Sequence, residues 1–484
     1  MNRISLAVAT RDQPDDLRRM IPRRQTVWLV LIGIAALFIR LAPLARGDLK
    51  FQSAWDAADY IPLAQGIQHG CGFAKFDNGH CASAEILRPP GYPFFVAMMP
   101  GLRTVLVIQA FLGAALCIWL GWFVSARWGI GAGLTAAAIL ATDIPSIVYG
   151  AMIMSEALFQ FLLTGAILLQ LSAIIADELN AVTAAKVFAA AGLLAAAAMI
   201  RPTGIFLPLF APLPFLLMKG ATWPRALVLA VLAFAIPIAA MLPWMARNQR
   251  VAGVNAMSTD SAVTIFDYNA AGVLAYATHR SFGEASTELA HEIGWQGDPS
   301  AIPFTLSQAM IRQSFKTFAE HPFATLVVTV RGLVLVAIVP DRNELNELLG
   351  TNGGGPLGLA PSFDITTRIR RTMNSPVLAI LVLVQLMLNL LVWAGVARGL
   401  FRTDWNSKIE AACILIPLGV AFAMLACAAS PAAHARFRVP AVPFLAMLAG
   451  IGWLGRRADE VSSSETDVRD SAMAVRPVVS QMRG

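Results

Sequence analysis

The chain has 484 residues, of which 57% are hydrophobic and only 14% are charged, whereas soluble domains average about 45–50% and about 25%. A soluble fold has too little interior to bury so much apolar surface, so the composition excludes an ordinary soluble domain and predicts a protein embedded in lipid. The net charge of +7 does not indicate nucleic-acid binding, because the Lys and Arg residues are dispersed between apolar runs and form no aromatic-basic strip.

Long apolar runs predict an all-α polytopic membrane protein with roughly 10–12 transmembrane helices, because about 20 residues of helix cross about 30 Å of hydrocarbon. The runs long enough for a crossing are Val27–Ala45, Leu102–Val124, Ile130–Ile144, Met152–Ala176, Ala184–Ile200, Ala226–Trp244, Pro376–Ala397 and Ala411–Ala429. The shorter runs are Ile205–Met218, Phe323–Val339 and Val439–Leu454. No internal repeat is evident, so nothing here favours an inverted-repeat transporter.

Positive charge sets the expected topology. Arginines crowd the segment before the first run, so residues 1–26 are expected to form a cytoplasmic N-terminus. The first run is too long for a signal peptide, and residues 27–455 are expected to form one membrane domain. Its extracytoplasmic loops then comprise residues 46–92 and 245–321. Residues 456–484 are rich in Ser, Asp, Glu and Arg, which predicts a disordered tail.

The later part of the chain leaves two topologies open. Phe304–Glu320 predicts a surface helix at the membrane interface, and the apolar run Phe323–Val339 follows it. If that run crosses fully, the polar segment Asp341–Arg371 is cytoplasmic and the C-terminal tail is external. If the run, which contains Arg331 near its middle, is re-entrant, the tail stays inside.

Two of the five cysteines, Cys71 and Cys81, fall in the first extracytoplasmic loop. Disulfides persist outside the cytoplasm, so these two residues are a disulfide candidate, with two unpaired thiols as the alternative.

The first extracytoplasmic loop holds the strongest candidates for chemistry. Asp56 and Asp59 closely follow the first span, next to Tyr60, and Arg88 begins a proline-rich run that leads back to the bilayer. A carboxylate suits a general base for an attacking hydroxyl. The simpler interpretations are a helix cap for Asp56 and a solvated loop acid for Asp59.

Further charged residues lie at the predicted extracytoplasmic ends of other spans. They are Asp143, Glu156, Arg201, Arg247, His434, Arg436 and Arg438. Arginines suit a phosphate leaving group, because they donate paired hydrogen bonds and do not titrate. The simpler interpretations are a turn-former for Asp143, a structural partner for Glu156, interface anchoring for Arg201 and Arg247, and topogenic charge for Arg436 and Arg438.

In order, these motifs resemble those of the GT-C membrane glycosyltransferases, in particular the group of protein O-mannosyltransferases and lipid A aminoarabinose transferases. The group carries an Asp-Glu-x-x-Tyr motif after its first span, and the matching stretch here is Asp56-Ala57-Ala58-Asp59-Tyr60. Ala57 replaces the second acid, and Asp59 could substitute for it one helical turn later. The resemblance covers about residues 27–455 and implies a GT-C-like fold whose extracytoplasmic first loop carries short helices.

The resemblance implies transfer of a sugar from a polyprenyl-phosphate-linked donor to an extracytoplasmic hydroxyl by inverting displacement. Asp56 would be the catalytic base, with the sugar and phosphate contacts drawn from Asp59, Tyr60, Arg88, Asp143, Glu156, Arg201, Arg247, His434, Arg436 and Arg438. The expected partners are the lipid-linked donor, an acceptor that is a lipid, a glycan or a protein, and the lipids of a cell membrane, typically a bacterial inner membrane.

No redox cofactor is needed for such a transfer, and no zinc spacing is present, although a divalent cation could bridge Asp56, Asp59 and the phosphate. Two other functions stay open. The first is a flippase or transporter for a lipid-linked glycan, against which the polar residues gather at one membrane face. The second is a non-catalytic accessory subunit of glycan assembly, which the Ala57 substitution leaves open.

Overall fold

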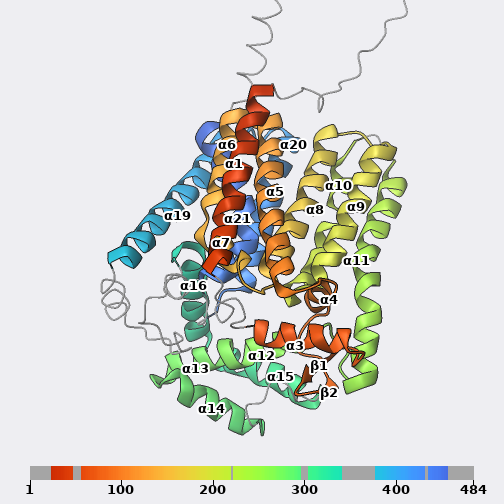
Figure 1. Ribbon diagram of the computed structural model, residues 1–484, viewed down its shortest axis with the longest axis vertical. Coiled ribbons are helices and arrows are strands. Elements are labelled where there is room, and N and C mark those ends of the chain that lie inside the picture. Colours follow the sequence, from red (N-terminus) through yellow and green to blue (C-terminus); the bar gives the residue numbers. More distant parts are fainter. Residues whose placement is uncertain are drawn as a thin grey trace, which may run out of the picture.

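The computed structural model describes residues 23–46, 56–219, 222–295, 304–340, 376–430 and 434–455. These residues form a bundle of long helices with a layer of shorter elements at one end (Figure 1). The predicted all-α polytopic class is confirmed. Most of the N-terminal segment, the whole tail 456–484 and the polar segment Asp341–Arg371 lie outside the described residues.

Among the described residues, eight helical segments are long and apolar enough to cross a membrane, or up to ten if each of two bent pairs is one span. The eight are α1 (Arg23–Leu41) with η1 (Ala42–Arg46), α5 (Leu102–Trp128), α8 (Glu156–Ala176), α9 (Ala181–Ala198), α11 (Trp223–Ala252), α19 (Pro376–Arg402), α20 (Lys408–Cys427), and η5 (Ala435–Ala441) with α21 (Val442–Leu454). Large apolar side chains such as Trp28 and Phe38 are exposed on the bundle exterior. This exposure is expected where lipid is the solvent.

The upper count of ten agrees with the lower end of the 10–12 spans expected from hydropathy, and proline explains why two of the expected apolar runs are broken. The run from Ile130 divides into α6 (Ile130–Thr142) and α7 (Ile144–Gly150), which are bent by 52° next to Pro145. The run Ile205–Met218 becomes a 3₁₀ helix, η2 (Pro202–Phe210), and the short α10 (Leu213–Leu217). Proline lacks a backbone N–H and disrupts α-helical hydrogen bonding, so neither run forms a single regular α-helix.

The described chain begins and ends at the same end of the bundle. Leu29 of α1 packs against Gly121 late in α5, and Leu454 packs against Gly131 at the start of α6. Since α6 directly follows α5, both contacts lie at one end (Figure 1).

The helix α16 (Pro322–Ile338) is bent by 106° from the preceding helix and does not run the length of the bundle. The carbonyl of Ile338 accepts a hydrogen bond from Asn389, which lies midway along α19. This arrangement agrees with the re-entrant alternative for Phe323–Val339.

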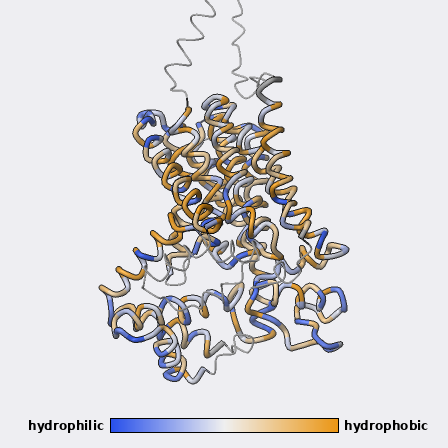
Figure 2. Tube along the Cα trace, turned by 60° about the vertical axis from the view of Figure 1, so that its left-hand side comes forward, coloured by the Kyte–Doolittle hydropathy of each residue, from blue (hydrophilic) through white to orange (hydrophobic). Residues whose placement is uncertain are grey.

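At the opposite end from the start of α1 lies a layer of short elements, called the cap layer below (Figure 1). The first loop contributes α3 (Ala57–Gln68), β1 (Ala74–Asp77) and β2 (His80–Ala84), and α4 (Gly91–Ala97) leads back to the bundle. The later segment contributes α12 (Asp260–Val263), the π-helix η3 (Thr264–Ala270), α13 (Ala271–Thr278), α14 (Phe282–Glu292) and α15 (Phe304–Glu320). Hydrophilic residues are concentrated in this layer, whereas the bundle is mainly hydrophobic (Figure 2).

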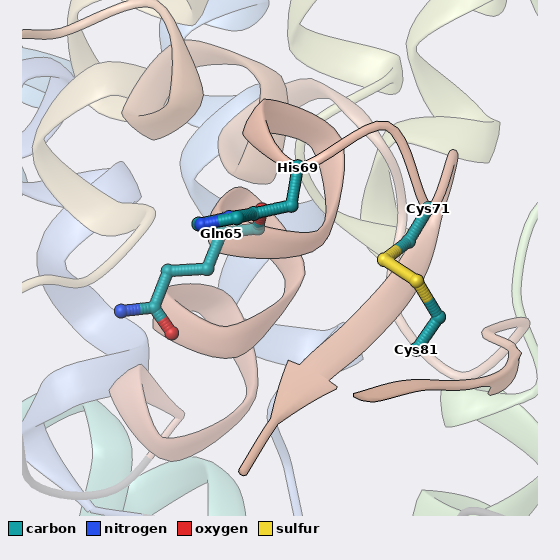
Figure 3. The surroundings of a disulfide bond; sticks show 4 residues. All are labelled: Gln65, His69, Cys71 and Cys81. Atoms are coloured by element: carbon teal, nitrogen blue, oxygen red, sulfur yellow. A yellow bond between two sulfur atoms is a disulfide. The ribbon is translucent and has the colours of Figure 1, made fainter. Parts of the chain in front are cut away.

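A disulfide closes the hairpin of the cap layer. Cys71 precedes β1 and bonds to Cys81 in β2, with their Cα atoms 5.6 Å apart, so of the two alternatives for these cysteines the structure has the disulfide (Figure 3). The two strands pair antiparallel. Arg247 of α11 donates hydrogen bonds to the carbonyls of Phe73 and Glu85, at 3.1 and 2.6 Å. The hairpin is therefore held at both its start and its end.

Candidate active site

Oppositely charged side chains from the loops after α1 and α11 and from three bundle segments meet where the bundle joins the cap layer. This charge cluster consists of Asp56, Asp59, Lys75, Arg88, Glu156, Arg201, Asp260 and Arg436. Residues separated by as many as 380 positions pair directly within it. Five of the predicted loop and helix-end residues are joined to Asp56 in this network.

Asp56 occupies the centre of the charge cluster. It directly precedes α3, yet its side chain makes no capping hydrogen bond to that helix. One carboxylate oxygen instead accepts a hydrogen bond from Arg88 at 2.8 Å, and the other accepts one from Arg436. Burial opposes the charge of Asp56, but Arg436 and Arg88 outweigh it and hold its pKa well below the usual range. Asp56 is therefore a carboxylate at physiological pH.

The half of the charge cluster that belongs to the bundle is the more buried, and it is called the membrane-side half. Glu156, the first residue of α8, is fully buried. Its Oε1 atom accepts hydrogen bonds from Arg436 Nε at 2.5 Å and pairs with Arg201 at 2.7 Å. Arg201 directly precedes η2, and Arg436 lies in η5. Three helix ends thus bring two guanidinium groups together around one carboxylate.

The other half of the charge cluster, called the cap-side half, is built from the cap layer and the loop between β2 and α4. Asp59 pairs with Lys75 of β1 at 2.6 Å and with Arg88 at 2.8 Å. Arg88 also pairs with Asp260 at 3.4 Å. These side chains are 15–28% exposed, whereas those of the membrane-side half are 0–12% exposed.

Two tyrosines fix α3 against the bundle beside these charges. The ring of Tyr60 lies 5.6 Å from the Arg88 guanidinium and meets the ring of Tyr92 edge to face at 4.8 Å. The Tyr92 hydroxyl donates a hydrogen bond to Gln109 of α5 at 2.6 Å. Burial and the charge of Asp56 raise the pKa of Tyr60 to about 12. Its hydroxyl is therefore protonated at neutral pH.

Two of the predicted arginines donate hydrogen bonds to backbone carbonyls. Arg247 holds the hairpin, as described above. Arg438, only two residues from Arg436, donates hydrogen bonds to the carbonyls of Val336 and Ala337 at the end of α16, at 3.2 and 3.3 Å. A guanidinium at a helix C-terminus satisfies carbonyls that have no intrahelical partner. The structure therefore places both arginines in contacts that support the fold.

The remaining two predicted residues also lie in local contacts. Asp143 caps α7 and accepts hydrogen bonds from the backbone N–H and the hydroxyl of Ser146, at 2.9 and 2.7 Å. This is the turn-forming role weighed for it in the sequence. The ring of His434 meets the ring of Phe437 edge to face at 4.7 Å.

Lys75 and Asp260 belong to the charge cluster but carry no motif in the sequence. Lys75 reaches Asp59 because the disulfide-closed hairpin places β1 beside α3. Asp260 follows a Ser-Thr pair at a helix start, a common capping pattern, near the start of the loop 245–321. Only folding within the first loop identifies Lys75, and only pairing between the two loops identifies Asp260.

A cavity of about 340 Å³ lies behind η5, between α6, α19 and α21. Its lining is mainly apolar, with Trp393, Val392 and Leu445 among its walls, and it includes Arg438 and Asp143. The segment η5 therefore contributes Arg436 to the charge cluster and Arg438 to the wall of this cavity.

A divalent cation that bridges Asp56 and Asp59 would need carboxylate oxygens that are free to bind it. Within the described part of the chain, no three His, Cys, Asp or Glu side chains are grouped so that they could hold a metal ion. Both oxygens of Asp56 are bonded to guanidinium groups, and Asp59 is bonded to Lys75 and Arg88. The carboxylates therefore do not fit a bridging cation in this arrangement.

By structure, the chain is similar to the oligosaccharyltransferase AglB of Archaeoglobus fulgidus, in complex with an inhibitory peptide and a dolichol-phosphate, and to the apo form of the enzyme from the same organism. In each case the identity is 14% over 88% of this chain and 50% of the other, with a TM-score of 0.46. The chain thus spans about half the length of these archaeal proteins. No protein-family model and no curated protein matches it by sequence.

Proposed function

We propose that the protein transfers a sugar from a polyprenyl-phosphate-linked donor to a hydroxyl group of an acceptor on the extracytoplasmic side of the membrane. The observation that carries this proposal is the position of Asp56, a carboxylate between two guanidinium groups where the bundle meets the cap layer. A base for a hydroxyl and cations for a phosphate are the two groups that this displacement needs.

In the proposed reaction, Asp56 takes the proton of the acceptor hydroxyl as the acceptor oxygen bonds to the anomeric carbon. The bond between that carbon and the phosphate oxygen breaks, and polyprenyl phosphate leaves with the electron pair. Arg436 and Arg201 stabilise the charge that develops on the phosphate, since guanidinium groups bind phosphate through paired hydrogen bonds. Asp59 and Glu156 hold Arg88 and Arg436 in place and contact sugar or acceptor hydroxyls.

Donor binding would also activate the base. With Arg88 and Arg436 on its two oxygens, Asp56 has little capacity to accept a proton. A donor phosphate competes for the same guanidinium nitrogens. When it takes Arg436, one oxygen of Asp56 is released and the pKa of that carboxyl rises toward its ordinary value. Asp56 would then become a competent base mainly when the donor is in place.

The lipid tail of the donor would lie in the cavity behind η5. The cavity is mainly apolar and lies among the membrane helices α6, α19 and α21. The same short segment carries Arg436 toward the charge cluster and Arg438 at the cavity. A phosphate at Arg436 would therefore lie close to the mouth of an apolar site suited to polyisoprenoid.

A transporter of lipid-linked glycans is the other class of function. It would need charged groups along a path through the bilayer midplane. Two arginines buried in the bundle, Arg40 and Arg438, donate hydrogen bonds to backbone carbonyls at helix ends. Those contacts give each arginine a structural role, which favours the enzyme.

The test uses purified protein in detergent with a radiolabelled polyprenyl-phosphate hexose, and it measures release of polyprenyl phosphate. Asp56→Asn should lower the rate by roughly 10²- to 10⁴-fold, the usual contribution of a positioned general base. The Asn side chain is nearly isosteric, and its amide oxygen can still accept a hydrogen bond from one of the two arginines, so folding should be retained. Asp267→Asn, in the cap layer outside the charge cluster, is the matched control. Transfer by Asp56→Asn at the wild-type rate would refute the assignment of the base.

A further inference from the structure

The two halves of the charge cluster come from different parts of the structure. Glu156, Arg201 and Arg436 lie at the ends of bundle segments, where the proposed function places the donor phosphate. Asp59, Lys75 and Asp260 come from the cap layer, which covers one end of the bundle (Figure 1). Asp56 is bonded to one arginine of each half. If the donor occupies the membrane-side half, the acceptor must approach Asp56 from the cap side.

Thr259, in the cap layer, has a buried hydroxyl and directly precedes Asp260, the most exposed acid of the charge cluster. The backbone N–H of Thr259 donates to the carbonyl of Ile86 at 3.1 Å, which ties the second loop to the first just before Arg88. Thr259 is only 2% exposed, and its hydroxyl has no hydrogen-bond partner among the described residues. An unsatisfied buried hydroxyl costs free energy that a polar ligand would recover.

Asp260, the next residue, has the capacity to bind a ligand. Its contact with Arg88, at 3.4 Å, is the longest ion pair of that arginine, whose other two pairs measure 2.8 Å. Its side chain is 28% exposed, more than that of any other member of the charge cluster. Burial nevertheless raises the pKa of Asp260 above its ordinary value. The carboxyl group is thus close to Arg88, accessible and not saturated by partners.

We infer that Thr259 and Asp260 form the acceptor-binding position of this enzyme, where they bind a hydroxyl group of a neutral acceptor beside Arg88 and Asp56. This inference rests on the proposed function. Asp260 would accept a hydrogen bond from one acceptor hydroxyl and, through Arg88, keep the neighbouring hydroxyl directed at Asp56. Thr259 would supply the buried hydroxyl that a second polar group of the acceptor satisfies.

Charge makes this position selective. Three acids, Asp56, Asp59 and Asp260, already pair with the single guanidinium group of Arg88 at this position. An anionic acceptor would add a further negative charge beside these acids, and like charges at short range repel. The position should therefore prefer a neutral hexoside to an acidic one.

The experiment measures transfer from the radiolabelled polyprenyl-phosphate hexose to methyl glucoside and to methyl glucuronide, which differ by one carboxylate. Asp260→Asn should raise the KM for methyl glucoside about tenfold, because a hydrogen bond to a charged carboxylate becomes a weaker one to a neutral amide, and should leave the KM for the donor unchanged. It should also lower the ratio of kcat/KM for methyl glucoside to kcat/KM for methyl glucuronide. Thr259→Val should raise the KM for methyl glucoside and leave the KM for the donor unchanged. Asp260→Glu keeps the charge, so it should retain part of the wild-type preference for methyl glucoside over methyl glucuronide.

The control is Glu288→Gln on α14, whose partner is Arg280 at the surface. A purely structural role for Asp260 would change the donor and acceptor KM values together, and that result would overturn the inference. An unchanged acceptor KM in both Asp260→Asn and Thr259→Val, with active enzyme, would also overturn it. If the wild-type protein releases no polyprenyl phosphate in the presence of any acceptor, water included, the proposed function itself fails.

Discussion

The membrane-side and cap-side halves of the charge cluster use the same chemistry in different surroundings. Around Glu156, two guanidinium groups and one carboxylate are almost fully enclosed by bundle helices. Around Asp59, a lysine and an arginine pair with the carboxylate in a layer that water reaches. A buried pair is costly to break because it leaves an uncompensated charge away from water, whereas an exposed pair is screened. The membrane-side half should therefore dominate stability, and the cap-side half should allow adjustment around a substrate.

The largest expected effect comes from breaking the membrane-side half. Glu156→Gln removes the charge between Arg201 and Arg436 but preserves the size of the side chain. It should lower the free energy of unfolding by roughly 3–5 kcal/mol, as for other broken buried pairs. Thermal unfolding in detergent, followed by circular dichroism, measures the change.

A control for this variant must not add a buried charge, so Gln160→Glu and Gln170→Glu are both unsuitable. The suitable control is Glu284→Gln on the exposed surface of α14. An unfolding transition for Glu156→Gln close to that of wild type would show that burial does not strengthen the membrane-side half.

The second effect concerns the pH dependence of Asp56, which both halves control. Arg88 and Arg436 lower the pKa of Asp56, so removing one positive charge must raise it. In Arg88→Gln the carboxylate is therefore protonated at higher pH than in wild type. The acid limb of the pH profile of kcat/KM should move to higher pH, by roughly one to three units for the loss of an adjacent opposite charge.

The control for this shift is Arg280→Gln, which removes an arginine from a surface pair on the cap layer. Its acid limb should coincide with that of wild type. If the acid limb of folded Arg88→Gln does not move, the group whose ionisation limits the reaction is not Asp56.

The sequence predicts the bundle well because membrane spans depend on local composition. Runs of apolar residues identify α1, α5 and α8 within a few residues, since each span must satisfy its own backbone hydrogen bonds in lipid. Bent helices are less predictable. The break at Asp143 depends on Pro145 together with Arg40, a buried residue of α1 whose guanidinium bonds to the carbonyls at the end of α6.

The arginines show why the candidate site is only partly predictable. Arg436 and Arg438 are two residues apart and chemically identical, yet Arg436 binds carboxylates and Arg438 binds carbonyls of α16. Arg201 and Arg247 differ in the same way. Position at a helix end places an arginine at the right depth in the membrane. Only its rotation about the helix axis and its distant neighbours decide the partner, and neither is encoded locally.

The smallest effect is expected at the outer edge of the cap-side half. Lys75→Met keeps most of the apolar stem and removes the charge that pairs with Asp59 at 2.6 Å. Since both partners are partly exposed, the free energy of unfolding should change by no more than about 1 kcal/mol. A double-mutant cycle with Asp59→Asn isolates the coupling between the two side chains. A coupling energy of about 3 kcal/mol or more would contradict the difference between the two halves. The pair would then be as strong as one enclosed by the bundle, and water would not be screening the cap-side half.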